Sequence, residues 1–267
     1  MAALPALDLT PAVRPHLTAI ASGKGGVGKT WLAVTLAHAL AAEGHRVLLF
    51  DGDLGLANVD IQLGFTPAHD LGAVLAGRVS LADAAMPIEG AGFAVLPGRS
   101  GSGTLAELPS GALATVLGEL AALPYDHVLL DLGAGVDAAN RRMAAGADTL
   151  LVLVTDEPTS LTDAYAVIKL HEADAPRADV RIVVNLATGP TAGQRTYTTL
   201  ARACARFLGR TPKLAGIVRR DPHVTDAIRH QIPLLTRHPN SQAAADVRQI
   251  AVGLGREERQ GALPPVP

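Results

Sequence analysis

The chain has 267 residues, of which 48% are hydrophobic, and a formal net charge of −2 at pH 7. This length and composition allow one sizeable buried core, and the near-neutral charge provides no global positive field of the kind that attracts nucleic acid. The single cysteine, Cys204, excludes an intramolecular disulfide framework and metal sites built from several cysteines, which favours a reducing compartment.

Residues 1–15 carry three prolines and lack the basic start and apolar run of a secretory signal. We expect this segment to be a flexible extension. No stretch of the chain approaches the roughly 20 apolar residues that a membrane-spanning helix needs. The expected location is therefore the cytoplasm.

Apolar runs of strand length alternate with helix-like stretches along the rest of the chain. The runs cover residues 17–21, 47–50, 93–96, 128–130, 150–154, 182–184 and 214–218. The helix-like stretches cover residues 30–43, 104–123, 160–172, 191–208 and 241–254. Continuous apolar runs are typical of strands buried on both faces. The pattern predicts one α/β domain over 16–255, a doubly wound and mainly parallel sheet with helices on both faces, and a disordered tail at 256–267.

The first apolar run leads into a phosphate-loop motif. Its residues are Gly23, Lys24, Gly25, Gly26, Val27, Gly28, Lys29 and Thr30, which fit G-x-x-x-x-G-K-S/T. Backbone N–H groups of such a loop converge on phosphate oxygens. We expect Lys29 to face the β- and γ-phosphates, the Thr30 hydroxyl to bind Mg²⁺, and Trp31 to pack beside the nucleotide. The alternative is a glycine-rich turn that binds nothing, and the strand before the loop and the periodic helix after it argue against that alternative.

Acidic residues follow two of the other apolar runs. Asp51 and Asp53 come after the run 47–50, and Asp131 ends the run 128–130 in the manner of a Walker B strand. The carboxyl ends of parallel strands are where open α/β sheets bind ligands, and a Walker B carboxylate holds Mg²⁺. Aspartates at strand ends are also common helix caps and turn formers, and this alternative stays open.

Lys24 gives the loop a second lysine, and K-G-G-V-G-K-T resembles the deviant Walker A motif of the MinD/ParA family of P-loop ATPases, which have the SIMIBI-type fold. The resemblance implies a homodimer that forms with ATP and Mg²⁺, in which Lys24 reaches the phosphates of the facing subunit. A second ammonium on developing phosphate charge acts as an arginine finger does. The implied catalytic residues are Lys24, Lys29 and Asp53, with Asp53 orienting the attacking water. The implied metal ligands are Thr30, Asp51 and Asp131.

Several further segments resemble the FlhG branch of this family (also called FleN or YlxH), whose members control flagellar number and placement. These segments are residues 51–60, 63–64, 96–101, 131–135, 157–165 and 221–224. The likeness covers about 17–254, and D-x-D-L-G-L-A-N and E-P-T-S-x-T-D-A-Y are its most specific parts. It implies slow, partner-stimulated ATP hydrolysis. The partners it implies are an FlhF-like GTPase, a FleQ-like activator or a C-ring component. It also implies that such a partner recruits the protein to the cell pole or the inner membrane.

The adenine side of the site rests on the resemblance alone. Asn185 resembles the family asparagine that hydrogen-bonds adenine, although a turn asparagine at a strand end is the alternative. Val218 and Arg219 stand where the family has Ile-Pro, so the adenine pocket is expected to differ there. Leu132 replaces the usual threonine after the Walker B aspartate. The expected nucleotide-binding residues are Gly23, Lys24, Gly25, Gly26, Val27, Gly28, Lys29, Thr30, Trp31, Asn185, Val218 and Arg219.

Two features of many FlhG proteins are missing: the N-terminal D-Q-A-x-x-L-R segment and an evident membrane-targeting helix. The stripe Ala244, Val247, Ile250, Ala251 and Leu254 favours core packing over a membrane anchor, so membrane binding is expected to be weak or none. Two rival functions stay open. One is an ATPase that positions DNA, another cargo or the division site, although DNA is not favoured by the charge. The other is a regulatory module that binds ATP without turnover.

Overall fold

The computed structural model describes residues 14–53, 55, 57–98 and 110–261. Eight strands in this part of the chain form one sheet in the order β3-β4-β2-β5-β1-β6-β7-β8. The strands are β1 (His16–Ser22), β2 (Val47–Gly52), β3 (Met86–Pro87), β4 (Ala94–Leu96), β5 (His127–Ala134), β6 (Thr149–Val154), β7 (Asp179–Ala187) and β8 (Lys213–Arg219). All neighbours are parallel except the short pair β3–β4.

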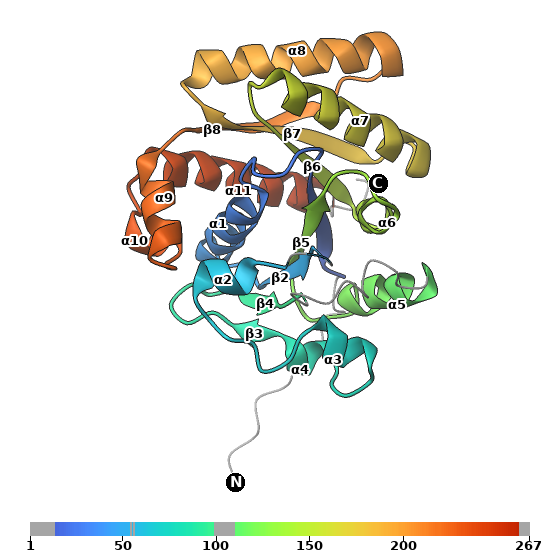
Figure 1. Cartoon of the computed structure of the whole chain (residues 1–267), viewed down its shortest axis with the longest axis vertical. Coiled ribbons are helices and arrows are strands. Elements are labelled where there is room, and N and C mark those ends of the chain that lie inside the picture. Colours follow the sequence, from blue (N-terminus) through green and yellow to red (C-terminus); the bar gives the residue numbers. More distant parts are fainter. Residues whose placement is uncertain (1–13, 54, 56, 99–109, 262–267) are drawn as a thin grey trace, which may run out of the picture.

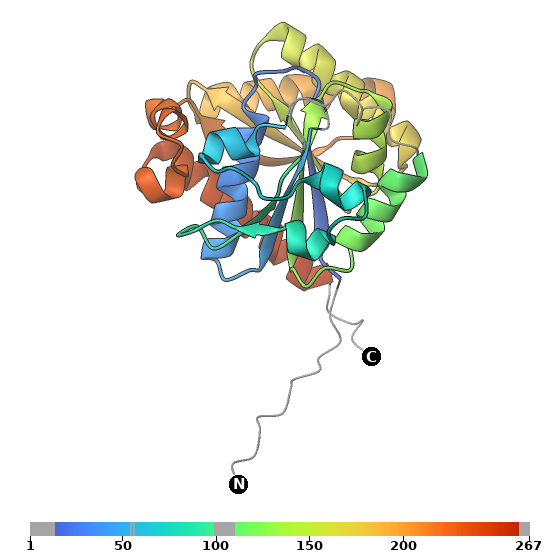
Figure 2. The same ribbon diagram turned by 60° about the horizontal axis from the view of Figure 1, so that its bottom comes forward.

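Helices cover both faces of the sheet (Figures 1 and 2). One face carries α1 (Lys29–Ala42), α2 (Val59–Leu63), α9 (Pro222–Arg229), α10 (Leu234–Arg237) and α11 (Gln242–Gly261). The other carries α3 (Leu71–Leu75), α4 (Leu81–Ala84), α5 (Ser110–Leu120), α6 (Ala138–Ala145), α7 (Pro158–Asp174) and α8 (Pro190–Leu208). This arrangement confirms the predicted doubly wound, mainly parallel fold.

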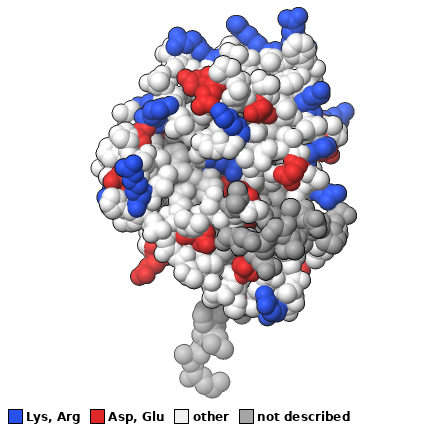
Figure 3. Space-filling model, in the orientation of Figure 1, with Lys and Arg blue, Asp and Glu red and all other residues white. Residues whose placement is uncertain are grey.

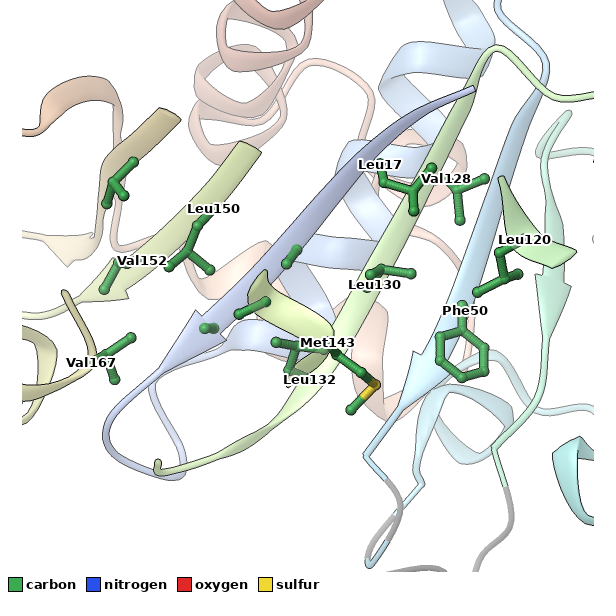
Figure 4. Close-up of a cluster of buried hydrophobic side chains, with 14 of the residues drawn as sticks. Leu17, Phe50, Leu120, Val128, Leu130, Leu132, Met143, Leu150, Val152 and Val167 are labelled. Carbon is green, nitrogen blue, oxygen red and sulfur yellow. The ribbon is translucent and has the colours of Figure 1, made fainter. Parts of the chain in front are cut away.

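The strand residues alternate between two hydrophobic cores, one on each side of the sheet. In β2, Leu48 and Phe50 face one core, whereas Val47 and Leu49 face the other. Figure 4 shows the first core, in which Phe50 lies near Leu120 of α5. Both faces are apolar because both are covered, which is why the strands read as continuous apolar runs. Each fully buried aliphatic side chain stabilises the fold by roughly 1.5–3 kcal/mol.

The predicted stripe on α11 lies in the second core. Its five residues, Ala244, Val247, Ile250, Ala251 and Leu254, are at most 2% exposed. This burial confirms core packing, and the stripe is not a membrane anchor. Over the described residues, no helix is long and apolar enough to cross a bilayer.

The structure differs from the sequence prediction at the end of α11 and in the strand β3. α11 continues to Gly261, so the tail does not begin at residue 256; Arg, Glu and Gln in this stretch are good helix formers. α5 is described from Ser110, and the expected start at residue 104 lies outside the described residues, as do 1–13, 54, 56, 99–101 and 262–267. The antiparallel strand β3 was not predicted, because two residues are too few to show a period and one of them, Pro87, suits only a sheet edge.

Candidate nucleotide site

The phosphate loop connects β1 to α1 at the carboxyl edge of the sheet. Gly28 has φ +89°, and a Cβ atom there would lie 2.6 Å from Nδ2 of Asn185, so only glycine fits this position. A Cβ atom on Gly23 would lie 2.4 Å from the carbonyl carbon of Asp163 in α7. The loop is therefore packed against α7 on one side and held by β7 on the other.

The loop leads into the N-terminus of a buried helix. Leu32 donates to the Gly28 carbonyl at 3.0 Å, which closes the first turn of α1. No acidic residue stands in that turn. The unpaired N–H groups and the positive end of the helix are therefore not neutralised by α1 itself, which is the condition that favours a bound phosphate.

Lys29 and Asp131 form a buried pair beneath the loop. Nζ of Lys29 lies 3.4 Å from Oδ1 of Asp131, and the two side chains are 9% and 0% exposed. Burial raises the pKa of Asp131, whereas the Lys29 ammonium and the Thr30 hydroxyl oppose this rise. Its second oxygen, Oδ2, has no hydrogen-bond partner in the described structure. An unpartnered buried carboxylate oxygen beside the Thr30 hydroxyl fits the oxygen donors that Mg²⁺ prefers.

Asp51 is paired with Asp131 across β2 and β5 by the strand register. Burial, followed by the charge of Asp131, raises the pKa of Asp51 to about 7. Its Oδ2 accepts from the backbone N–H groups of Asn58 and Val59, each at 3.0 Å, and its Oδ1 accepts from the N–H of Asp53 at 3.3 Å. Asp51 thus satisfies backbone donors at the start of α2, as a capping aspartate does, and its role as a metal ligand stays a prediction.

Asp53 lies farther out than Asp51 and lines the open groove. Its Oδ1 accepts from the backbone N–H of Gly55 at 3.3 Å. Its position on the loop-facing side is the one that the water-orienting prediction requires, and the catalytic role itself stays a prediction.

Lys24 points away from the groove in this single chain. Its ammonium contacts the carboxylate of Glu157, the N-cap residue of α7, and lies 3.3 Å from the hydroxyl of Thr159 in the first turn of that helix. The Lys24 side chain is 40% exposed. Sequence analysis did not foresee this contact, which brings together two of the segments that carry the family resemblance.

The predicted adenine-side residues make other contacts. Asn185 is buried, and its Nδ2 donates to the Val27 carbonyl at 2.8 Å. Val218 is 1% exposed within the core. Nη2 of Arg219 lies 2.7 Å from Oδ1 of Asp246 in α11, and Nη1 donates to Gln242. These contacts give all three residues a structural role, and their contact with adenine stays a prediction.

An open groove of about 660 Å³ lies in front of the loop. Ser22, Gly25, Gly26, Gly28, Lys29, Thr30, Trp31, Asp53 and Ala134 line its loop side. Asn58, Ile61, Gln62, Ile228, Arg229 and Gln231 form its opposite wall, from α2 and the end of α9. Asn58 ends the D-x-D-L-G-L-A-N segment, whereas the other residues of this wall belong to no motif that the sequence analysis used, and no local pattern places α9 beside α2. A second hollow of about 680 Å³ lies on α8 and contains none of the predicted site residues.

The parallel sheet, the glycine-rich loop and the buried lysine–aspartate pair define a P-loop nucleotide-binding protein. Comparison with known proteins narrows this class. Residues 18–234 match the family model of the CobQ/CobB/MinD/ParA nucleotide binding domain. The chain therefore belongs to this family, and it carries a MinD/ParA-type ATPase domain.

The similar proteins include two flagellar regulators. The antiactivator FleN of Pseudomonas aeruginosa is 36% identical over 238 residues, which is 88% of this chain and 85% of FleN. The flagellum site-determining protein YlxH of Helicobacter pylori is 29% identical over 248 residues, covering 92% of this chain and 83% of YlxH. The septum site-determining protein MinD of Pyrococcus horikoshii, solved in complex with Mg-ADP, superposes with a TM-score of 0.77 at 25% identity, covering 93% of this chain and 99% of MinD.

Proposed function

We propose that this protein is an ATP-dependent dimerising switch that hydrolyses ATP and regulates flagellar number and placement. The observation that carries the ATPase proposal is an open groove lined by the loop and Lys29, with Asp131 buried against Lys29 and Asp51 beside Asp131 in the strand register. The similarity to FleN and YlxH supports the flagellar role.

The residues of the groove suit the binding of a magnesium–nucleotide complex. Lys29 would bind the β- and γ-phosphate oxygens, and the loop amides would donate to the same oxygens. Thr30, Asp51 and Asp131 would hold Mg²⁺, directly or through water. The metal, when bound, neutralises part of the phosphate charge. Asp53 would orient a water molecule for attack on the γ-phosphate.

Dimerisation would bring Lys24 to the phosphates of the second subunit. Lys24 would first have to leave Glu157, whose side chain is 57% exposed. An exposed ion pair stabilises a structure by only about 0–1 kcal/mol, so this contact is a weak restraint. A charge-assisted hydrogen bond to phosphate is stronger and would offset its loss.

The experiment combines turnover, sizing and a count of flagella. With ATP the wild-type protein should become a dimer and release phosphate slowly, and Lys29→Ala should do neither. Deleting the gene in its host should change the number or position of flagella, and wild type but not Lys29→Ala should restore them. Normal flagella in the deletion strain would contradict the flagellar role while leaving the ATPase assignment intact.

A second candidate is an ATPase that positions DNA. The observation in its favour is α8, which presents the exposed side chains of Arg195, Arg202 and Arg206 and contains no acidic residue. In Figure 3, basic side chains lie over this helix at the top of the molecule. Binding of random-sequence DNA that requires ATP and weakens steeply with salt would favour this candidate.

A further inference from the structure

We propose that Arg229, at the C-terminal end of α9, binds the phosphate chain of the nucleotide from the wall of the groove opposite the phosphate loop. The inference rests on the proposed ATP-binding function and adds to it a residue outside the loop motif. Arg229 lines the same groove as Lys29 and Thr30, although about 200 positions separate it from them in the chain.

The charges on the groove walls provide the first argument. Lys29, Asp53 and Arg229 are the charged residues among those that line it. The Lys29 ammonium already faces the carboxylate of Asp131 at 3.4 Å, and Asp53 adds negative charge. Without Arg229, these side chains would therefore offer a polyanion little net positive charge. Arg229 adds positive charge on this wall, and arginine suits phosphate because its guanidinium donates two parallel hydrogen bonds.

The partners of the neighbouring charges provide the second argument. Arg229 is exposed and makes no ion pair or side-chain hydrogen bond with any described residue. The nearest acid on its own helix, Asp226, is occupied by Arg237 at 2.5 Å and by His238 at 2.6 Å. His230, the next residue after Arg229, also lies 3.3 Å from Asp226. The Asp226 carboxylate thus has other partners, and the guanidinium of Arg229 remains available to a ligand.

The position of α9 is set by a contact with α2 within the same wall of the groove. Nε2 of Gln231 donates to the carbonyl of Ile61 in α2 at 2.7 Å. Gln231 has a left-handed backbone, with φ +56°. A Cβ atom added to Gly64 would lie 2.9 Å from the Cβ atom of Gln231. Glycine at position 64 permits this close approach. The end of α9 is therefore tied to α2, and Arg229 in its last turn lines the groove together with the phosphate loop. Figure 1 shows α9 and α2 on the same side of the molecule.

A plain structural role for Arg229 is the alternative. A cation in the last turn of a helix interacts favourably with the helix dipole and stabilises the protein by about 0.3–1 kcal/mol. That role predicts a small loss of stability on substitution and no change in nucleotide affinity. The two roles therefore differ in a measurable quantity.

The test measures the affinity of the full-length chain for a fluorescent ATP analogue with Mg²⁺, and the displacement of this analogue by inorganic pyrophosphate. Arg229→Met keeps the length of the side chain and removes its charge. We expect this variant to lower the affinity for both ATP and pyrophosphate by about 10-fold. The affinity should also depend less on salt concentration than that of the wild-type protein. Arg229→Lys should recover part of the affinity. Arg202→Met is the matched control, because Arg202 is also an exposed helical arginine without an ion pair and lies on α8, away from the groove.

Different outcomes test ATP binding by the protein and phosphate binding by Arg229. Absence of ATP binding by the wild-type protein would contradict the proposed function. Wild-type affinity in Arg229→Met, or a loss equal to that of Arg202→Met, would overturn the inference alone. A lower affinity for ATP with an unchanged affinity for pyrophosphate would also overturn the inference, since Arg229 would then contact the base or the ribose. Normal affinity with lost dimerisation, measured by light scattering, would assign Arg229 to a subunit contact instead. Thermal unfolding of the nucleotide-free variants checks that each is folded.

Discussion

The buried pair Lys29–Asp131 should stabilise the nucleotide-free protein as well as bind phosphate. Lys29→Met removes the ammonium, keeps much of the side-chain volume and leaves the Asp131 carboxylate, which is 0% exposed, without its cation. At 3.4 Å and an effective dielectric constant of roughly 20, two unit charges attract each other by about 5 kcal/mol, which is an upper bound.

Two features of the pair reduce this value. The separation of 3.4 Å exceeds the roughly 2.8 Å of a strong charge-assisted hydrogen bond. Burial also raises the pKa of Asp131, so that the carboxyl can take up a proton when its cation is lost. We therefore expect Lys29→Met to lower the free energy of unfolding by about 2 kcal/mol, which corresponds to about 5 °C in Tm for a domain of this size.

The assay is thermal and urea unfolding of the nucleotide-free protein, combined with ATP binding. The double variant Lys29→Met/Asp131→Asn removes both charges and should regain most of the lost stability, because no charge is then left buried alone. It should not regain ATP binding. If Lys29→Met unfolds at the wild-type temperature, or if the double variant is no more stable than the single one, the buried-pair reasoning is wrong.

Four further predictions concern catalysis, assembly, pH and membranes. Asp53→Ala should lower ATP turnover by about 10²–10⁴ while ATP affinity changes little, because Asp53 lies outside the loop; turnover at the wild-type rate would remove its catalytic role. Lys24→Ala should lose dimerisation and turnover together in light scattering with a non-hydrolysable analogue, and an unchanged dimer and rate would exclude a cross-subunit role. Burial and the neighbouring His45 and His16 lower the pKa of His127 to about 4. Between pH 6.5 and pH 4 this histidine is therefore protonated in the unfolded chain but neutral in the folded protein, which lowers stability as the pH falls. Urea unfolding should therefore show a loss of about 2 kcal/mol from His127 between pH 7 and pH 5, and this loss should disappear in His127→Leu. The protein should not co-sediment with anionic vesicles in ATP, and strong recovery in the pellet would show a membrane surface that the buried α11 stripe does not provide.

The sequence by itself determined the class of protein and the main elements of its fold. Continuous apolar runs marked the strands because helices cover both faces of the sheet, so that consecutive strand residues are all buried and apolar. The phosphate loop was equally visible, since it is one contiguous segment whose glycines are required by backbone shape. Asp51 and Asp131 were placed at the correct edge of the sheet for the same local reason: each ends a run.

Only the tertiary structure decided which strand ends meet and what faces them. β2 lies beside β5 and not beside β1, which pairs Asp51 with Asp131, and the fold brings Lys29 against Asp131. The wall formed by α2 and α9, with Arg229, joins segments about 170 residues apart. Strand order and helix docking depend on the packing of surfaces that are distant in the chain, and no periodicity or local motif records these contacts. For the same reason the contacts of Arg219 with Asp246 and of Lys24 with Glu157 were visible only once the chain was folded.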